Sequence, residues 1–130
     1  MKTVFSLNRI VVAVTLWLLA QVALAAGSIS VDQLDQQISA GKAPMIIDVR
    51  TEDEFLAGHV PGARLIPHTQ MADYAKTLAG MKDEPIVLYC KSGKRAGMAA
   101  ETLEKAGFSK IEILDGSFQA WQAAGKKIVK

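Results

Sequence analysis

Short apolar runs alternate along the chain with amphipathic segments, and this alternation predicts the main elements of the fold. Four apolar runs have the length and composition of buried strands: residues 45–49, 63–66, 86–89 and 111–114. The segments between them carry apolar residues at every third or fourth position, as on one face of a helix. Strands that alternate with helices favour an α/β domain, in which helices cover both faces of a parallel sheet.

Capping signals mark the starts of the first two helices. Ser30 and Gln33 have the spacing of a capping box, and Thr51 and Glu54 have it again, so we expect the second helix to cover residues 52–57. Three further helices follow from the apolar spacing: one that carries Met71 and Leu78, one that carries Ala99 and Leu103, and one that carries Phe118 and Trp121.

The first 25 residues have the pattern of a secretory signal peptide. Lys2 and Arg9 form a short basic region, residues 10–24 are almost entirely apolar, and Ala23-Leu24-Ala25 has small residues where a signal peptidase requires them. We therefore expect cleavage after Ala25 and a periplasmic protein made of residues 26–130. The alternative is an uncleaved membrane anchor, for which the apolar run is short.

Charge and composition limit the classes of function. The 130 residues fit one domain, and the formal net charge is +2. Without Lys2 and Arg9 the remaining chain has 13 basic and 13 acidic side chains, so it lacks the basic excess typical of a nucleic-acid partner. One cysteine excludes an intrachain disulfide and a multi-cysteine metal site, and two histidines offer little for a histidine-based metal centre.

That single cysteine, Cys90, lies where a catalytic residue is expected. It follows the clearest strand, and a glycine-containing loop leads from it into a helix. In open parallel sheets, ligands bind outside the carboxyl ends of the strands. Free N–H groups and the dipole at a helix start lower the pKa of a thiol and favour the nucleophilic thiolate. The alternative is a buried structural cysteine.

Two groups of charged residues are candidates to act together with Cys90. Lys91, Lys94 and Arg95 give the loop three positive charges, which suit an anion. Asp48 and Arg50 end the preceding strand at the same sheet edge, where a charge pair would brace the Cys90 loop.

Three groups of residues resemble, in the same order, the signatures of the rhodanese family. They are Asp48-Val49-Arg50 with Gly58-His59-Val60-Pro61-Gly62-Ala63, then the loop from Tyr89 to Ala96, then Leu114-Asp115-Gly116-Ser117 with Ala120-Trp121. Ser117 departs from the family pattern, which commonly has a second glycine at this turn. With its export signal and single domain, the chain most resembles the small exported rhodaneses of the phage-shock type.

The resemblance implies a three-layer rhodanese-like domain with a five-stranded parallel sheet flanked by helices. It also implies sulfurtransferase chemistry, in which Cys90 takes a sulfur from thiosulfate as a persulfide and gives it to cyanide or a thiol. The loop that would bind the anionic donor and the persulfide consists of Lys91, Ser92, Gly93, Lys94, Arg95 and Ala96. No cofactor or metal, no nucleic acid and, once the signal is cleaved, no membrane is expected, and the expected state is a monomer.

Three other functions stay open from the sequence. Phosphatases and arsenate reductases of this fold have five residues between the cysteine and an arginine, whereas Arg95 comes one position too early and Ala96 stands at the required position. A non-catalytic module would hold a persulfide on Cys90 for a partner. A redox sensor would have Cys90 oxidised or paired between two chains.

Overall fold

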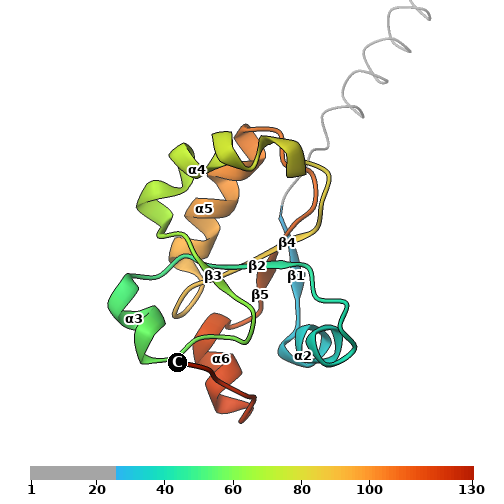
Figure 1. Cartoon of the computed structure of the whole chain (residues 1–130), viewed down its shortest axis with the longest axis vertical. Coiled ribbons are helices and arrows are strands. Elements are labelled where there is room, and N and C mark those ends of the chain that lie inside the picture. The colour runs from blue at the N-terminus through green and yellow to red at the C-terminus, as the bar shows by residue number, and fades with distance from the viewer. Residues whose placement is uncertain (1–25) are drawn as a thin grey trace, which may run out of the picture.

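A computed structural model describes residues 26–130, and the expected signal peptide, residues 1–25, lies outside this part of the chain. Its centre is a five-stranded sheet in the order β1-β5-β4-β2-β3, in which every strand pair is parallel (Figure 1). The strands are β1 (Gly27–Ile29), β2 (Met45–Asp48), β3 (Arg64–Leu65), β4 (Ile86–Tyr89) and β5 (Ile111–Leu114). The parallel α/β sheet predicted from the sequence is confirmed.

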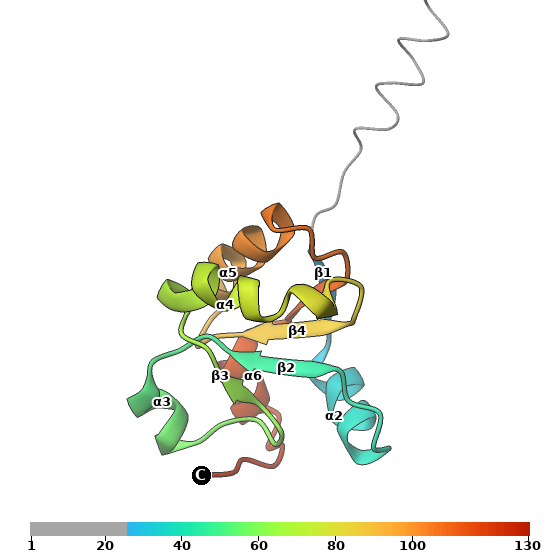
Figure 2. The ribbon, with the colours of Figure 1, turned by 45° about the horizontal axis from the view of Figure 1, so that its top comes forward.

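Helices cover both faces of this sheet. They are α2 (Val31–Ser39), α3 (Glu52–Ala57), α4 (Met71–Thr77), α5 (Lys94–Lys105) and α6 (Ser117–Ala123), with short 3-10 turns at His68–Gln70 and Ala79–Met81. The helices α4 and α5 lie on one face, α2 and α6 lie on the other, and α3 lies beside the edge strand β3 (Figures 1 and 2). None of the helices within residues 26–130 is long and apolar enough to cross a membrane.

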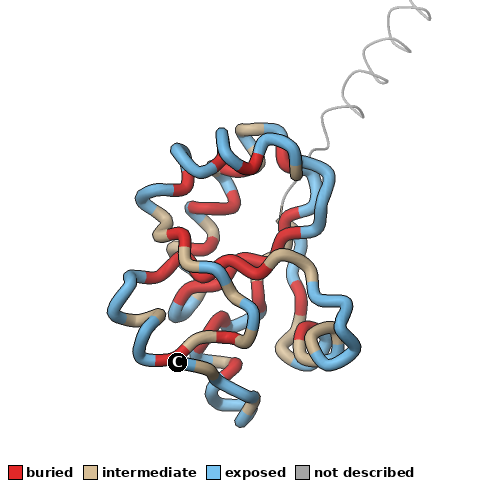
Figure 3. The backbone as a smooth tube through the Cα atoms, viewed as in Figure 1, coloured by how far each residue is buried: buried red, intermediate tan, exposed pale blue. Residues whose placement is uncertain are grey.

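Two apolar clusters join the layers, because successive strand residues point to opposite faces. Ile47 and Leu88 pack in the cluster that contains Ala99 of α5. Val87 packs in the other cluster, which contains the fully buried Trp121 of α6. Buried backbone accordingly runs through the middle of the sheet (Figure 3).

Local signals in the sequence fix most of the element boundaries. Both predicted capping boxes form, at Ser30 and at Thr51, and α3 covers the predicted residues 52–57. The strand β1 was not predicted from the apolar pattern, because it is an edge strand of three residues in which only Ile29 is buried. It pairs with β5, where Ile29 lies opposite Leu114.

The topology places Cys90 at the centre of one sheet edge. It directly follows β4, which lies between β5 and β2. Asp48 ends β2 in register with Tyr89 of β4, so the residues that follow these two strands meet at the same edge.

Candidate active site

The loop after β4 wraps its backbone around the Cys90 sulfur. The residue is 1% exposed, and its Sγ atom accepts a hydrogen bond from the backbone N–H of Gly93 at 3.0 Å. Gly93 has a φ of 123°, a conformation that side-chain-bearing residues rarely adopt, and α5 starts at the next residue. The glycine therefore lets the loop turn tightly enough to aim N–H groups at the sulfur.

These N–H groups outweigh the effect of burial on the thiol. Burial raises the pKa of Cys90, but hydrogen bonds from the backbone of Ala96, Gly93, Ser92 and Arg95 lower it, and the net pKa lies below the ordinary value for cysteine. The same groups solvate a negative sulfur in the way that an oxyanion hole solvates oxygen. The loop can thus hold an anionic sulfur without a metal ion.

We expect the Cys90 thiol to ionise at lower pH than an unperturbed cysteine. A lowered pKa means that the thiolate persists as the pH falls, so the midpoint of its ultraviolet absorbance should lie below that of an unperturbed cysteine. The titration is measured on residues 26–130, and the spectrum of Cys90→Ser is subtracted to remove the tyrosine contribution. A midpoint at or above that of free cysteine would mean that burial dominates.

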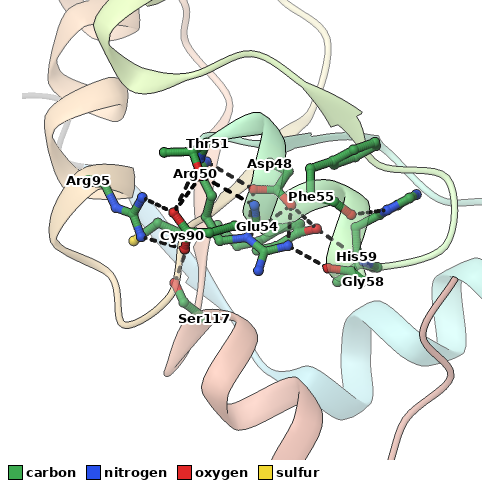
Figure 4. A network of polar contacts seen from close by, with 12 residues as sticks. Asp48, Arg50, Thr51, Glu54, Phe55, Gly58, His59, Cys90, Arg95 and Ser117 are labelled. Carbon is green, nitrogen blue, oxygen red and sulfur yellow. Dashed lines mark hydrogen bonds and ion pairs between the residues drawn. The ribbon is translucent and has the colours of Figure 1, made fainter. Parts of the chain in front are cut away.

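The start of α6 holds the beginning of the loop in place. Ser117 Oγ accepts a hydrogen bond from the Cys90 backbone N–H at 3.3 Å (Figure 4), and the N–H of Phe118 donates to the Cys90 carbonyl at 2.9 Å. The N–H of Gln119 donates to the Lys91 carbonyl at 3.1 Å. The start of α6 therefore fixes the N–H and the carbonyl of Cys90 and the carbonyl of Lys91.

The structure gives a reason for the serine at position 117, where the family pattern commonly has a glycine. It is fully buried and has a φ of 53°, a left-handed conformation that costs a non-glycine residue roughly 1–2 kcal/mol. The hydrogen bond from Cys90 gives this serine a function that glycine could not supply. From the sequence, Ser117 was expected only to affect the packing of its turn, and nothing local in the sequence points to its contact with Cys90.

Arg95 pairs with Glu54, which its position in the sequence predicts only as part of the cap of α3. Its two terminal nitrogens donate to the two carboxylate oxygens of Glu54 at 2.7 and 3.1 Å. The hydrogen bond from Arg95 lowers the pKa of Glu54 to about 2, so the carboxylate stays charged at neutral pH. Lys91 and Lys94 are exposed and make no ion pair within residues 26–130.

Asp48 and Arg50 form a buried ion pair under this edge of the sheet. Arg50 Nε donates to the two Asp48 oxygens at 3.0 and 3.1 Å, and Nη2 donates to Asp48 Oδ2 and to the Gly58 carbonyl, each at 2.7 Å (Figure 4). Burial favours the neutral form of Arg50, but the hydrogen bond and charge of Asp48 outweigh it and raise the pKa of Arg50. Arg50 thus stays charged, and its hydrogen bonds to Asp48 and Gly58 hold it in place.

Tyr89 joins this ion pair to β4, the strand that precedes Cys90. Its hydroxyl donates to Asp48 Oδ2 at 2.7 Å and accepts from the Val60 N–H at 3.1 Å. Burial and the Asp48 charge raise the pKa of Tyr89, so the hydroxyl remains a donor. The pair therefore contacts Tyr89, the last residue of β4, which directly precedes Cys90.

The residue types that could bind a metal ion are not clustered in the described residues. His59 stacks on Phe55, with ring centroids 3.7 Å apart, and its Nδ1 hydrogen-bonds the Phe55 carbonyl at 2.9 Å. Within residues 26–130, no three His, Cys, Asp or Glu side chains lie together in a way that could hold a metal ion.

Comparisons with known proteins find related sequences. Residues 30–124 match the family model described as the rhodanese-like domain. The protein YqhL of Bacillus subtilis, itself uncharacterised, is 39% identical over 88 residues, which are 67% of this chain and 68% of that protein. The thiosulfate sulfurtransferase GlpE of Pseudomonas fluorescens is 32% identical over 78 residues, which are 60% and 70% of the two chains.

A solved structure agrees with the fold described above. The crystal structure of the Alr3790 protein from Anabaena superimposes with a TM-score of 0.72 at 28% sequence identity, over 78% of this chain and 81% of that chain.

Proposed function

Since the chain belongs to the rhodanese-like domain family, we propose that it is a thiosulfate sulfurtransferase that carries sulfur as a persulfide on Cys90. The observation that supports this most strongly is the loop around Cys90, whose N–H groups converge on a sulfur atom with a lowered pKa. The similarity to GlpE, whose name states thiosulfate sulfurtransferase, points to the same donor.

In the first step the Cys90 thiolate attacks the outer sulfur of thiosulfate. The bond between the two sulfurs of thiosulfate breaks, sulfite leaves with the bonding electron pair, and a persulfide remains on Cys90. The backbone N–H groups that solvate the thiolate then solvate the terminal sulfur of the persulfide.

In the second step cyanide or a thiolate attacks that terminal sulfur. The persulfide S–S bond breaks, thiocyanate or a new persulfide leaves, and Cys90 returns as a thiolate. No net oxidation occurs, so the cycle needs no external oxidant or reductant.

The activity is tested by incubating residues 26–130 with thiosulfate and cyanide and measuring thiocyanate, beside the same protein with an aryl phosphate. We expect thiocyanate to form catalytically and the phosphate ester to stay intact. Hydrolysis of the ester without thiocyanate would favour a phosphatase instead. A persulfide that forms without turnover would favour a non-catalytic carrier.

We further expect the charge next to the loop to set the affinity for the donor. Arg95→Ala would leave the Glu54 carboxylate uncompensated beside an anionic substrate, and should raise the KM for thiosulfate about fivefold. Lys91→Ala should do less, because Lys91 is more exposed to solvent. Glu54→Gln, which releases Arg95 from its partner, should lower the KM.

Steady-state kinetics at two salt concentrations test this assignment. Added salt should raise the KM of the wild type more than that of Arg95→Ala. If neither the three substitutions nor the salt changes the KM, the backbone N–H groups alone bind the donor.

The site is proposed to act in the periplasm, in an exported member of the family of the phage-shock type, made of residues 26–130 and monomeric. Its proposed partners are a small anionic sulfur donor and a cyanide or thiol acceptor, without nucleic acid or membrane.

The basic start, the apolar run and Ala23-Leu24-Ala25 support the export. N-terminal sequencing of the protein from an extracytoplasmic fraction should therefore begin at Ala26. An intact Met1 in protein confined to the cytoplasm would contradict the export.

A further inference from the structure

A depression of about 540 Å³ lies beside the Cys90 loop. It is lined by residues of the loops after β2 and β4, of α3, of α6 and of the segment that follows α6: Arg50, Glu54, Ala57, Gly58, Lys91, Phe118, Gln122, Ile128 and Lys130. Cys90 itself does not line it, although the next residue does. The depression therefore lies next to the backbone loop that surrounds the Cys90 sulfur, called the cradle below. It is far larger than one sulfur atom.

Arg50 presents an unused donor to this depression. Its Nε and Nη2 atoms are bound to Asp48 and Gly58, whereas Nη1 has no hydrogen-bond partner within residues 26–130 (Figure 4). Arg50 is 4% exposed, and no fully buried side-chain nitrogen or oxygen of the described residues lacks a partner. Nη1 is thus not fully buried, and because Arg50 lines the depression, Nη1 is the hydrogen-bond donor that this residue has left to offer there.

The remaining charges and apolar groups define what would fit there. Glu54 is neutralised by Arg95, and Lys91 makes no ion pair within residues 26–130, so the wall next to the cradle favours an anion. Phe118 and Ile128 add apolar surface, and the Phe118 ring lies 4.1 Å from the Arg50 guanidinium carbon. Two other depressions lie at the opposite end of the sheet, where Lys42 and Glu112 place both signs of charge in each.

We propose that this depression is the acceptor subsite and that it selects a small thiol carrying a carboxylate. The inference rests on the proposed sulfur transfer. The carboxylate accepts a hydrogen bond from Arg50 Nη1, the carbon chain of the acceptor lies against Phe118 and Ile128, and the thiol reaches the persulfide across Lys91. The acceptor thiolate attacks the terminal sulfur, the persulfide S–S bond breaks, Cys90 leaves as a thiolate, and the acceptor departs as a persulfide.

Gln122 allows a test that spares Arg50 and the cradle. It is exposed on α6 and lines the depression, so Gln122→Glu adds a negative charge there and Gln122→Lys adds a positive one. Gln36→Glu is the matched control, since Gln36 is an exposed glutamine on α2 that lines a depression at the opposite end of the sheet. The acceptors compared are 3-mercaptopropionate, which is anionic, 2-mercaptoethanol, which is neutral, and cyanide.

With 3-mercaptopropionate, Gln122→Glu should raise the KM about fivefold and Gln122→Lys should lower it. Each variant is compared with the wild type for the same acceptor, so differences in the intrinsic reactivity of the two thiols cancel. The KM for 2-mercaptoethanol should not change, the KM values for the anions thiosulfate and cyanide should change less than that for 3-mercaptopropionate, and Gln36→Glu should change none of them. Equal KM values for 3-mercaptopropionate in all four proteins would overturn the proposal. An effect on thiosulfate alone would assign the depression to the donor.

A binding measurement separates this proposal from the proposed activity. The unreactive thioether 3-(methylthio)propionate, titrated into isotopically labelled protein, should shift the amide resonances of Gly58, Lys91 and Gln122, and Gln122→Glu should weaken the binding. Binding without any persulfide on Cys90 would reject the sulfur transfer and leave an anion site. A persulfide on Cys90 without binding would reject the subsite and leave the sulfur transfer.

Discussion

Cys90→Ser is expected to abolish sulfur transfer while the protein stays folded. A serine hydroxyl is not ionised at neutral pH and cannot form the persulfide, so turnover with thiosulfate and cyanide should fall at least about a thousandfold. The substitution is nearly isosteric, and the backbone contacts of Cys90 with Ser117 and Phe118 do not involve the sulfur.

Circular dichroism and the thermal midpoint control for folding and should match the wild type closely. A Cys90→Ser protein that keeps more than a few per cent of the wild-type thiocyanate production would show that another group carries the sulfur. A loss of activity together with a loss of structure would show instead that Cys90 is needed for packing.

Asp48→Asn is expected to have the largest effect on stability. The variant keeps the shape of the side chain but leaves Arg50 charged and buried without its counter-charge. Breaking a buried ion pair in this way typically costs about 3–5 kcal/mol of unfolding free energy. Urea unfolding measures the change, and tryptophan fluorescence and circular dichroism should give the same midpoint.

Glu101→Gln is the matched control, because it also replaces a carboxylate that is paired with a cation. Glu101 contacts Lys105 at 2.9 Å, but both side chains are exposed, and such pairs contribute little to stability. A small effect of Asp48→Asn, equal to that of Glu101→Gln, would mean that the Asp48–Arg50 pair does not support the edge of the sheet.

The sequence was most informative where a structure depends on neighbouring residues. Capping boxes involve residues three positions apart, so the starts of α2 and α3 could be predicted. Asp48 and Arg50 are two positions apart at the end of a strand, which puts their side chains on one side and made a charge pair foreseeable.

Contacts between distant segments were not predictable in the same way. Glu54 lies 41 positions before Arg95, and its carboxylate looked fully explained by the Thr51 cap. Ser117 lies 27 positions after Cys90, and only the packing of α6 against the loop brings its hydroxyl to the Cys90 N–H. The strand β1 could not be predicted for a different reason, because it has too few buried residues to produce a recognisable apolar pattern.

The most direct test of the account is the intact mass of the protein after incubation with thiosulfate and removal of the excess. We predict one added sulfur, about 32 Da, which peptide mapping assigns to Cys90 and which cyanide removes. Cys90→Ser should never acquire this mass. An unchanged mass in the wild type, or an added sulfur that also appears in Cys90→Ser, would contradict the claim that Cys90 is the carrier.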